Sequence, residues 1–135
     1  MKKILLYAML VIVTFGCTQS EDNPAPPTLI GQWRLTQVLA DPGDGSGVFR
    51  DSNNGKLLQF MSDGKVLSST PLCAMNSLLT VVGDGTYDTE FIYPKDCQSS
   101  GLKIGYKIEG ESLILYYPCI EACAEKYVKE ASSGK

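Results

Sequence analysis

The strongest constraint on the fold is an alternation of apolar and polar residues between Gly101 and Lys129. Every second residue is apolar from 102 to 108 and again from 113 to 117, and Gly110-Glu111 separates the two runs. This pattern predicts a β-hairpin with one buried face. A second return at 118 to 123 and a short strand near 125 to 129 extend the hairpin to a meander. Because a lone hairpin is only marginally stable in water, the upstream chain must cover its apolar face.

The first sixteen residues are typical of a secretory signal. Lys2 and Lys3 precede an apolar run from 4 to 15, which ends at Gly16-Cys17. The run is shorter than the roughly 20 residues of a membrane span, and the basic start and the small residue predict cleavage. A cysteine at this point resembles the lipobox of bacterial lipoproteins, which implies that Cys17 is acylated. The alternative is an uncleaved anchor helix with an incidental cysteine.

Residues 17 to 28 are predicted to be the lipidated cysteine and a tether. They hold three prolines and two acidic residues and no apolar run, so an extended linker is expected. The acidic patch Ser20-Glu21-Asp22 resembles the export signal that Bacteroidetes lipoproteins use to reach the outer face of the outer membrane. That resemblance implies a lipid-anchored outer-membrane protein at the cell surface. The alternative is that acidic residues are simply common in solvated linkers.

The length of the mature protein limits its number of domains, and its net charge limits its partners. Cleavage after residue 16 leaves 135 − 16 = 119 residues, which is the usual size of one domain. We place this domain at 29 to 130 and a tail at 131 to 135. Loss of two lysines moves the net charge from −3 to −5, and no basic cluster is present. Nucleic acid is therefore not an expected partner.

The domain is predicted to be all-β. Eight short strands are expected, with turn-rich connections and no helical period between them. They lie near 31 to 39, 56 to 61, 65 to 70, 77 to 82, 86 to 93, 102 to 109, 112 to 118 and 124 to 129. Such a chain forms an up-and-down antiparallel β-barrel or a two-sheet sandwich. We favour the closed eight-stranded barrel because closure removes exposed edges.

Several short motifs resemble those of a known β-barrel family and so support the barrel. Gly31-Gln32-Trp33 at the head of the first strand resembles the lipocalin signature. Together with Leu58-Gln59-Phe60, the turn at 62 to 66, Gly85-Thr86-Tyr87 and the run from 117 to 129, it resembles the small lipocalin-like domains of Bacteroidetes lipoproteins. The resemblance covers 29 to 129 and implies that Trp33 plugs one end of the barrel. It implies a fold more than an activity.

In an up-and-down barrel, successive connections lie at alternate ends, so each connection can be assigned to one of the two ends. Glycine-containing turns at 62 to 64, 83 to 85 and 110 to 111 should share one end. The long connections at 40 to 55, 71 to 75, 94 to 100 and 118 to 123 should share the other. The chain enters beside Trp33 at the tight-turn end, so the long loops are expected to face away from the tether.

All four cysteines of the mature domain lie in these long connections. An even number of cysteines in an exported chain predicts disulfides. Of the three possible pairings we favour Cys73 with Cys97 and Cys119 with Cys123, because the second pair flanks a three-residue turn. A zinc site is the alternative, but the chain has no histidine and no Cys-x-x-Cys spacing.

No catalytic constellation is evident. Without histidine, neither a Ser-His nor a Cys-His nucleophile pair can form. Asp41, Asp44 and Asp51 share one long loop, which suggests a calcium site, but their spacing misses the EF-hand pattern. We therefore predict no enzyme, no cofactor and no metal.

Two functions are possible, and they differ in whether the barrel interior is open or filled. Eight strands leave room for side chains alone or for one small ligand. Tyr87, Phe91, Tyr93, Tyr106, Tyr117 and Tyr127 are the expected inward aromatic residues, and they either line a pocket or fill the barrel.

The leading hypothesis is that the barrel binds a small apolar or amphipathic ligand at a mouth on the long-loop side. The predicted lining residues are Leu39, Tyr93, Leu102, Tyr106 and Tyr117. The alternative is a non-enzymatic protein-interaction module that uses the disulfide-stapled loops. A pocket would favour the ligand, whereas a filled barrel with exposed apolar loops would favour the interaction module.

Overall fold

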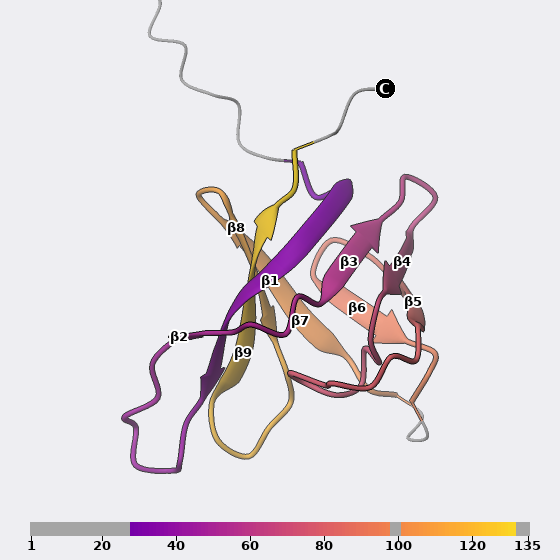
Figure 1. Ribbon diagram of the computed structural model, residues 1–135. Coiled ribbons are helices and arrows are strands. Elements are labelled where there is room, and N and C mark those ends of the chain that lie inside the picture. Colours follow the sequence, from indigo (N-terminus) through magenta and orange to yellow (C-terminus); the bar gives the residue numbers. More distant parts are fainter. Residues whose placement is uncertain (1–27, 98–100, 132–135) are drawn as a thin grey trace, which may run out of the picture.

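A single antiparallel β-sheet closes on itself in the computed structural model, which describes residues 28–97 and 101–131 (Figure 1). Its strand order is β2-β1-β3-β4-β5-β6-β7-β8-β9, and a pairing between β1 and β9 closes the barrel. The strands are β1 (Gly31–Ala40), β2 (Arg50–Asp51), β3 (Leu57–Phe60), β4 (Lys65–Ser68), β5 (Gly83–Tyr87), β6 (Phe91–Pro94), β7 (Ile104–Glu109), β8 (Ser112–Tyr116) and β9 (Cys123–Lys129).

The predicted all-β, eight-stranded, up-and-down antiparallel barrel is confirmed. The barrel strands are β1 and β3 to β9, and β2 is a two-residue addition paired to the end of β1. Within the described residues no helix is long and apolar enough to cross a membrane. Cys17, the predicted signal segment and nearly all of the tether lie outside those residues.

The long first strand holds the barrel together. Residues 31 to 34 of β1 pair with β3, and residues 33 to 40 pair with β9 along the opposite edge. A register shift between Leu35 and Gln37 marks a bulge in the pairing with β9. Bulges bend a strand and increase its twist, which helps a sheet to close. Trp33 and Leu35 are buried on the inward face of β1.

The fourth predicted strand is wrong. Residues 77 to 82 form no strand, and the region predicted as one strand from 86 to 93 belongs to a hairpin of β5 and β6. The turn of this hairpin lies at 88 to 90, where Asp88 Oδ1 accepts the backbone N–H groups of Glu90 and Phe91, each at 2.8 Å. An aspartate that caps its own turn in this way needs no glycine.

Gly83 and Gly85 serve close packing inside β5 and not a turn. A Cβ atom on Gly83 would lie 2.6 Å from the backbone nitrogen of Leu72, and one on Gly85 would lie 2.7 Å from the carbonyl oxygen of Tyr93. Real Cβ atoms do not approach backbone so closely. Strand glycines often mark such close approaches.

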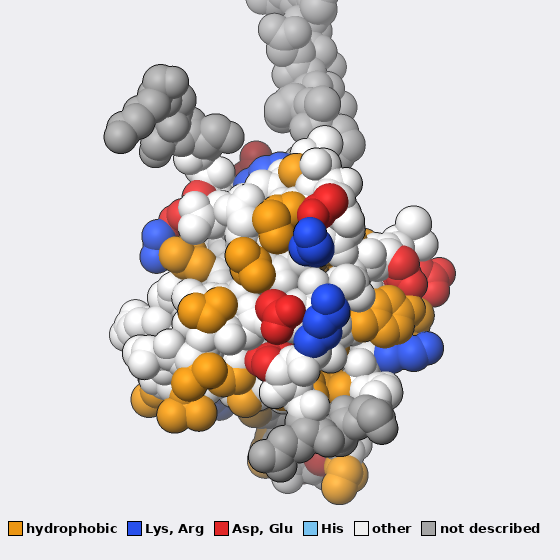
Figure 2. Space-filling model, turned by 90° about the vertical axis from the view of Figure 1, so that its right-hand side faces the viewer, with side chains coloured by type: hydrophobic (Ala, Val, Ile, Leu, Met, Phe, Trp, Pro, Cys, Tyr) orange, Lys and Arg blue, Asp and Glu red, His pale blue; other side chains and the backbone are white. Residues whose placement is uncertain are grey.

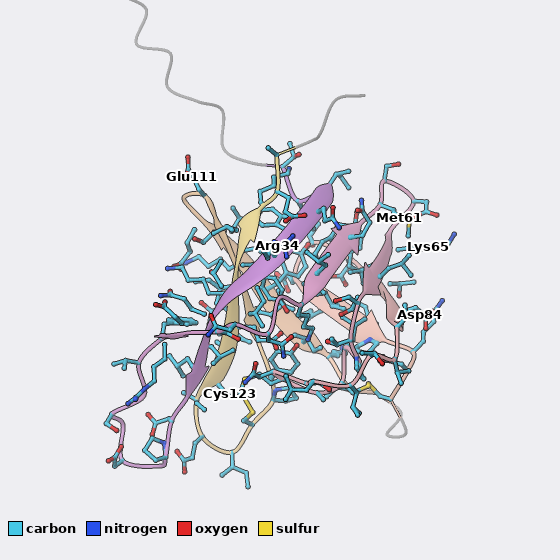
Figure 3. The ribbon with its side chains drawn as sticks, viewed as in Figure 1. Arg34, Met61, Lys65, Asp84, Glu111 and Cys123 are labelled. Atoms are coloured by element: carbon cyan, nitrogen blue, oxygen red, sulfur yellow. A yellow bond between two sulfur atoms is a disulfide. The ribbon has the colours of Figure 1, made fainter. Side chains whose placement is uncertain are left out.

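The two ends of the barrel differ as predicted, with one tight turn replaced. The turns at 61 to 64, 88 to 90 and 110 to 111 lie at the end where β1 begins and β9 ends (Figure 1). Figure 3 shows Met61 and Glu111 toward this end and Cys123 at the opposite end. The loops at the opposite end are 41 to 49 and 52 to 56 on either side of β2, 69 to 82, the described residues 95 to 97 and 101 to 103, and 117 to 122, and we call them the long-loop rim.

The barrel interior is occupied by side chains. Trp33 is fully buried at the tether end, and its Nε1 donates to the carbonyl of Leu29 at 2.8 Å. Phe60 packs edge-on against Tyr87, with ring centroids 5.1 Å apart. The buried apolar cluster consists of Trp33, Leu35, Leu58, Phe60, Val66, Leu72, Ile92, Ile104, Leu113, Leu115, Tyr117, Cys123 and Tyr127.

Two of the expected inward aromatic residues point outward. On β6 the buried residue is Ile92, whereas Phe91 and Tyr93 are only partly buried. The Nζ atom of Lys103 lies 5.6 Å from the centroid of each of these two rings. The displaced hairpin turn explains the error, because a shift of one residue in a strand moves every side chain to the other face.

Candidate interaction surface at the long-loop rim

Two disulfides cross-link the long-loop rim. Cys73 is bonded to Cys97 with a Cα–Cα distance of 5.5 Å, and Cys119 is bonded to Cys123 with a Cα–Cα distance of 6.1 Å. This is the pairing favoured from the sequence. The first bond ties the loop after β4 to the loop after β6, and the second closes the loop between β8 and β9.

The loop after β4 covers the barrel mouth. Leu72 is fully buried in the core, and Met75 packs against that core from the rim. The backbone N–H of Leu72 donates to Asp96 Oδ2 at 2.9 Å, next to the disulfide of Cys97. The long-loop end is thus closed by the chain itself, at the place where an open mouth was considered.

A buried ion pair lies directly beneath this loop. Lys56, which precedes β3, and Glu125, on β9, have side chains with 0% exposure, and Lys56 Nζ lies 3.1 Å from Glu125 Oε2. The hydroxyls of Tyr117 and Tyr127 both donate to Glu125 Oε2, the first at 2.6 Å. The backbone N–H of Asn76 donates to Oε1 at 2.6 Å. We call these five residues the buried polar network.

Burial shifts the pKa values of Lys56, Tyr117 and Tyr127. It lowers the pKa of Lys56, an effect that the negative charge of Glu125 opposes. Burial, and then the charge of Glu125, raises the pKa of both Tyr117 and Tyr127 well above the usual range. Both hydroxyls therefore keep their protons at neutral pH and act as donors to the carboxylate.

The buried polar network makes the rim a fixed platform. Isolated buried charges are costly, but a carboxylate that accepts from a cation, two hydroxyls and a backbone N–H is well satisfied. Its members come from the chain before β3, the loop after β4, the loop after β8, and β9. One point under the mouth therefore joins four separate parts of the chain.

Lys56 and Glu125 were not among the residues predicted to be functional. Lys56 follows a glycine-containing loop, where a lysine is expected to be solvated. A usable signal lay in β9, where Cys123, Glu125 and Tyr127 share the inward face, so Glu125 is an acid at a core position. An acid at such a position requires a partner, because it is otherwise too costly to bury.

The aspartates of the first long loop organise its backbone. Asp41 Oδ1 accepts N–H groups from Gly43 at 2.8 Å and Gly45 at 3.1 Å, and Oδ2 accepts from Gly47 at 2.9 Å. These donors, Gly43 first, hold the pKa of Asp41 below its usual value. Asp51 accepts instead from Gln37 Nε2 at 3.0 Å. Asp41 and Asp51 therefore accept hydrogen bonds from different donors.

One group of metal-type ligand atoms occurs among the described residues, formed by Cys73, Asp96 and Cys97. The two sulfurs are joined to each other as a disulfide. Metals bind the thiolate form of cysteine, so the oxidised pair is a cross-link here and not a ligand set.

An exposed apolar segment runs along the rim from 78 to 82, with the sequence Leu-Leu-Thr-Val-Val. Its four aliphatic side chains are more than three fifths exposed: Leu78 84%, Leu79 63%, Val81 62% and Val82 64%. We call it the apolar segment. No backbone-to-backbone hydrogen bond from residues 78 to 82 occurs within the described part of the chain. Figure 2 shows hydrophobic side chains gathered low on the face that it draws.

A second apolar feature belongs to the disulfide-closed loop. Ile120, between Cys119 and Cys123, is fully exposed at the loop tip. Beside this loop lies a hollow of about 240 Å³ with mainly apolar walls, lined by Leu39, Phe49, Tyr116, Tyr117 and residues 119 to 124.

The five predicted ligand-binding residues do not come together at one place. Leu39 and Tyr117 line the hollow beside the disulfide-closed loop. Tyr93 lies on the outer face of β6, where its hydroxyl donates to Asp88 at 2.6 Å. Tyr106 lies toward the tight-turn end, where its hydroxyl donates to the backbone carbonyl of Asp88. Leu102 is partly buried in the loop before β7.

Comparison of this chain with protein-family models, with curated proteins and with solved structures finds no match.

Proposed function

We propose that this chain is an exported, lipid-anchored β-barrel whose long-loop rim binds a protein partner, without enzymatic activity. The observation that carries the proposal is the apolar segment, which is exposed on a barrel whose interior is already occupied. Contiguous exposed apolar side chains on a small domain are typical of an interaction site. Because side chains fill the interior, we favour the protein-interaction module over the ligand-binding barrel.

The rim has further properties of a binding surface. Its loops are pinned by two disulfides and by the buried polar network, so little conformational freedom is lost when a partner binds. The apolar segment has no charged residue, and interface centres are depleted in charge. Ile120, held at the tip of a closed loop, offers an additional rigid apolar contact.

The sequence supports an anchor at the opposite end. Ten residues lie between Cys17 and Thr28, where the described chain begins, and such a tether spans about 35 Å when extended. The barrel would then be held by its tight-turn end, with the rim directed away from the membrane. Partners of the rim would be proteins in solution, on another surface or anchored beside this chain in the same membrane. Membrane contact would be made through the lipid alone.

Site-specific photo-crosslinking in cells tests the proposed surface. A photoreactive amino acid at Leu79 should produce covalent adducts, because this side chain is exposed at the centre of the apolar segment. The same amino acid at Glu111, on an exposed tight turn, serves as the matched control. Equal labelling at both positions would refute the rim as the binding surface.

The anchor is tested separately. A Cys17→Ser variant should no longer incorporate labelled palmitate and should leave the membrane fraction. If this variant still carries label and sediments with membranes, the lipoprotein assignment is wrong.

A small apolar ligand is the second candidate, supported by the hollow beside the disulfide-closed loop. Two predicted ligand residues, Leu39 and Tyr117, line it together with Phe49. Its volume of about 240 Å³ is below the usual ligand-pocket range of about 300 to 1,000 Å³. Titration with an apolar fluorescent dye should show saturable binding that Phe49→Lys weakens. Unsaturable binding, unaffected by the substitution, would exclude this site.

A further inference from the structure

We propose that the partner of the apolar segment is a second copy of this chain, and that two copies pair through residues 78 to 82 as antiparallel β-strands about a twofold axis at Thr80. This inference rests on the proposed function, because it uses the same surface. It specifies the occupant, the register and the symmetry of the contact.

The sequence of the apolar segment favours a strand, yet it has no strand partner within the described part of its own chain. Leu-Leu-Thr-Val-Val is rich in β-branched residues and lacks charge, proline and glycine. This composition favours a strand. In the described chain, however, no ladder includes residues 78 to 82. Within the described residues, the N–H of Leu79 donates to Ser77 Oγ at 3.2 Å, and the other backbone groups of the segment have no backbone partner. Unpaired backbone groups along an apolar, strand-forming sequence are a template for pairing with another chain.

Both ends of the apolar segment are already fixed. At one end, the N–H of Asn76 donates to the buried carboxylate of Glu125 at 2.6 Å. At the other end, Gly83 pairs with Ser68 on β4 and packs against the backbone of Leu72. The intervening residues are therefore held at the surface, and pairing has to order only a short stretch of chain.

Self-complementarity identifies a second copy as the occupant. Centred on Thr80, the antiparallel register places Leu78 opposite Val82 and Leu79 opposite Val81, so every aliphatic residue meets another. Thr80 meets itself, and threonine pairs are favourable across antiparallel strands. A centre at residue 79 would instead oppose Val81 with Ser77. A centre at residue 81 would oppose Leu78 with Asp84.

The charges flanking the apolar segment are compatible with this register. Asp84, the nearest acidic residue, lies opposite the neutral Asn76 of the second copy. Like charges therefore do not face each other across the strands, although the whole chain has a net charge of −3. The contact is isologous, as expected for a twofold dimer.

The contact is small and should be transient in dilute solution. Five paired residues a side bury less than the roughly 1,000 Å² expected of a stable interface. Two copies anchored in the same membrane meet at a much higher effective concentration, which favours pairing without further contacts. The test therefore traps the contact on the full chain in cells.

A cysteine at the symmetry axis traps the dimer. Residues that face each other across antiparallel strands have Cα atoms about 4.5 to 5.5 Å apart, within the range of about 4.4 to 6.8 Å for disulfides. Thr80→Cys in the full-length exported chain should therefore give a covalent dimer on a non-reducing gel, and a thiol reductant should dissolve it. Ser62→Cys, on an exposed tight turn, should stay monomeric.

A second substitution tests the contact itself. Val81→Lys added to Thr80→Cys should lower the dimer fraction at least tenfold, because it buries two lysines opposite Leu79. Val128→Lys, at an exposed valine on β9, is the matched control and should leave the dimer unchanged. Similar dimer fractions for Thr80→Cys and Ser62→Cys would overturn the proposed pairing, as would a dimer that withstands Val81→Lys.

The outcome also separates this inference from the proposed function. A monomeric Thr80→Cys chain, together with photo-crosslinking of a different protein from Leu79, would refute self-pairing and keep the rim as an interaction surface. The absence of both products would refute self-pairing and the rim surface together.

Discussion

Replacing Lys56 with Met should destabilise the barrel by about 3 kcal/mol, because the change leaves the carboxylate of Glu125 buried without its cation. Both side chains of the pair are fully buried, with Lys56 Nζ 3.1 Å from Glu125 Oε2. Removal of one partner of a buried ion pair costs about 3 to 5 kcal/mol in general. We expect the lower value, since two tyrosine hydroxyls and the N–H of Asn76 still donate to the carboxylate.

The pair should show strong coupling in a double-mutant cycle. Lys56→Met combined with Glu125→Gln should lose at least about 1 kcal/mol less than the sum of the two single changes, because the double variant has no uncompensated buried charge. The assay is urea unfolding with the disulfides intact. The fluorescence of Trp33, the single tryptophan and a fully buried one, reports the transition.

A surface pair provides the matched control. Lys65 forms an ion pair with Asp63 at 2.7 Å, but both side chains are more than half exposed. Lys65→Met should therefore leave the unfolding midpoint unchanged, since exposed pairs contribute little. If Lys56→Met lowers the stability by no more than Lys65→Met does, the buried polar network does not hold the barrel and the reasoning is refuted.

Two further predictions concern the disulfide and alkaline pH. Replacing Cys73 and Cys97 together with Ser should lower the free energy of unfolding by about 3.5 kcal/mol by the loop-entropy relation for a separation of 24 residues, and urea titration measures it. The raised pKa values of Tyr117 and Tyr127 contribute stability that is complete below about pH 10 and is lost as the pH rises above it, by about 1.4 kcal/mol per pH unit for each tyrosine. The lowered pKa of Lys56 has the opposite effect: it makes the stability rise with pH until the usual lysine pKa is reached. The unfolding midpoint should therefore fall steeply only above about pH 10.5. A midpoint that stays constant from pH 10 to 12 would contradict the burial of both hydroxyls.

The sequence predicted the barrel because its signals are local. The alternation around β7 and β8 fixes which face of the hairpin is buried, and the tight turn at 110 to 111 fixes its register. Strand parity then predicted the barrel end at which the long loops and the four cysteines of the domain lie. That argument tolerated one misplaced turn, because a hairpin turn at 88 to 90 falls at the same end as the turn expected at 83 to 85.

The position of the fourth strand was not predictable from local signals. Residues 77 to 82 have the better strand composition, whereas β5 begins with Gly-Asp-Gly, which is typical of a turn. The outcome depends on contacts between distant residues. Gly83 and Gly85 leave room for the backbone near Leu72 and Tyr93, and no aliphatic residue would fit there. Tertiary packing therefore overrides strand propensity at this point.

The same long-range contacts explain why the functional expectation moved from the interior to the rim. Tyr117 and Tyr127 were expected either to line a pocket or to fill the barrel, and in the structure both hydroxyls donate to Glu125. A polar ligand at the mouth would have to compete with this carboxylate, and breaking the buried hydrogen bonds would cost about 1 to 3 kcal/mol for each group left unpaired. Leu72 would also have to leave the core. Residues 78 to 82 meet neither obstacle, since their aliphatic side chains are exposed and, within the described chain, their backbone groups make no backbone-to-backbone hydrogen bond before any partner arrives. Binding at the rim therefore requires no rearrangement of the barrel, which is the physical reason to expect the function there.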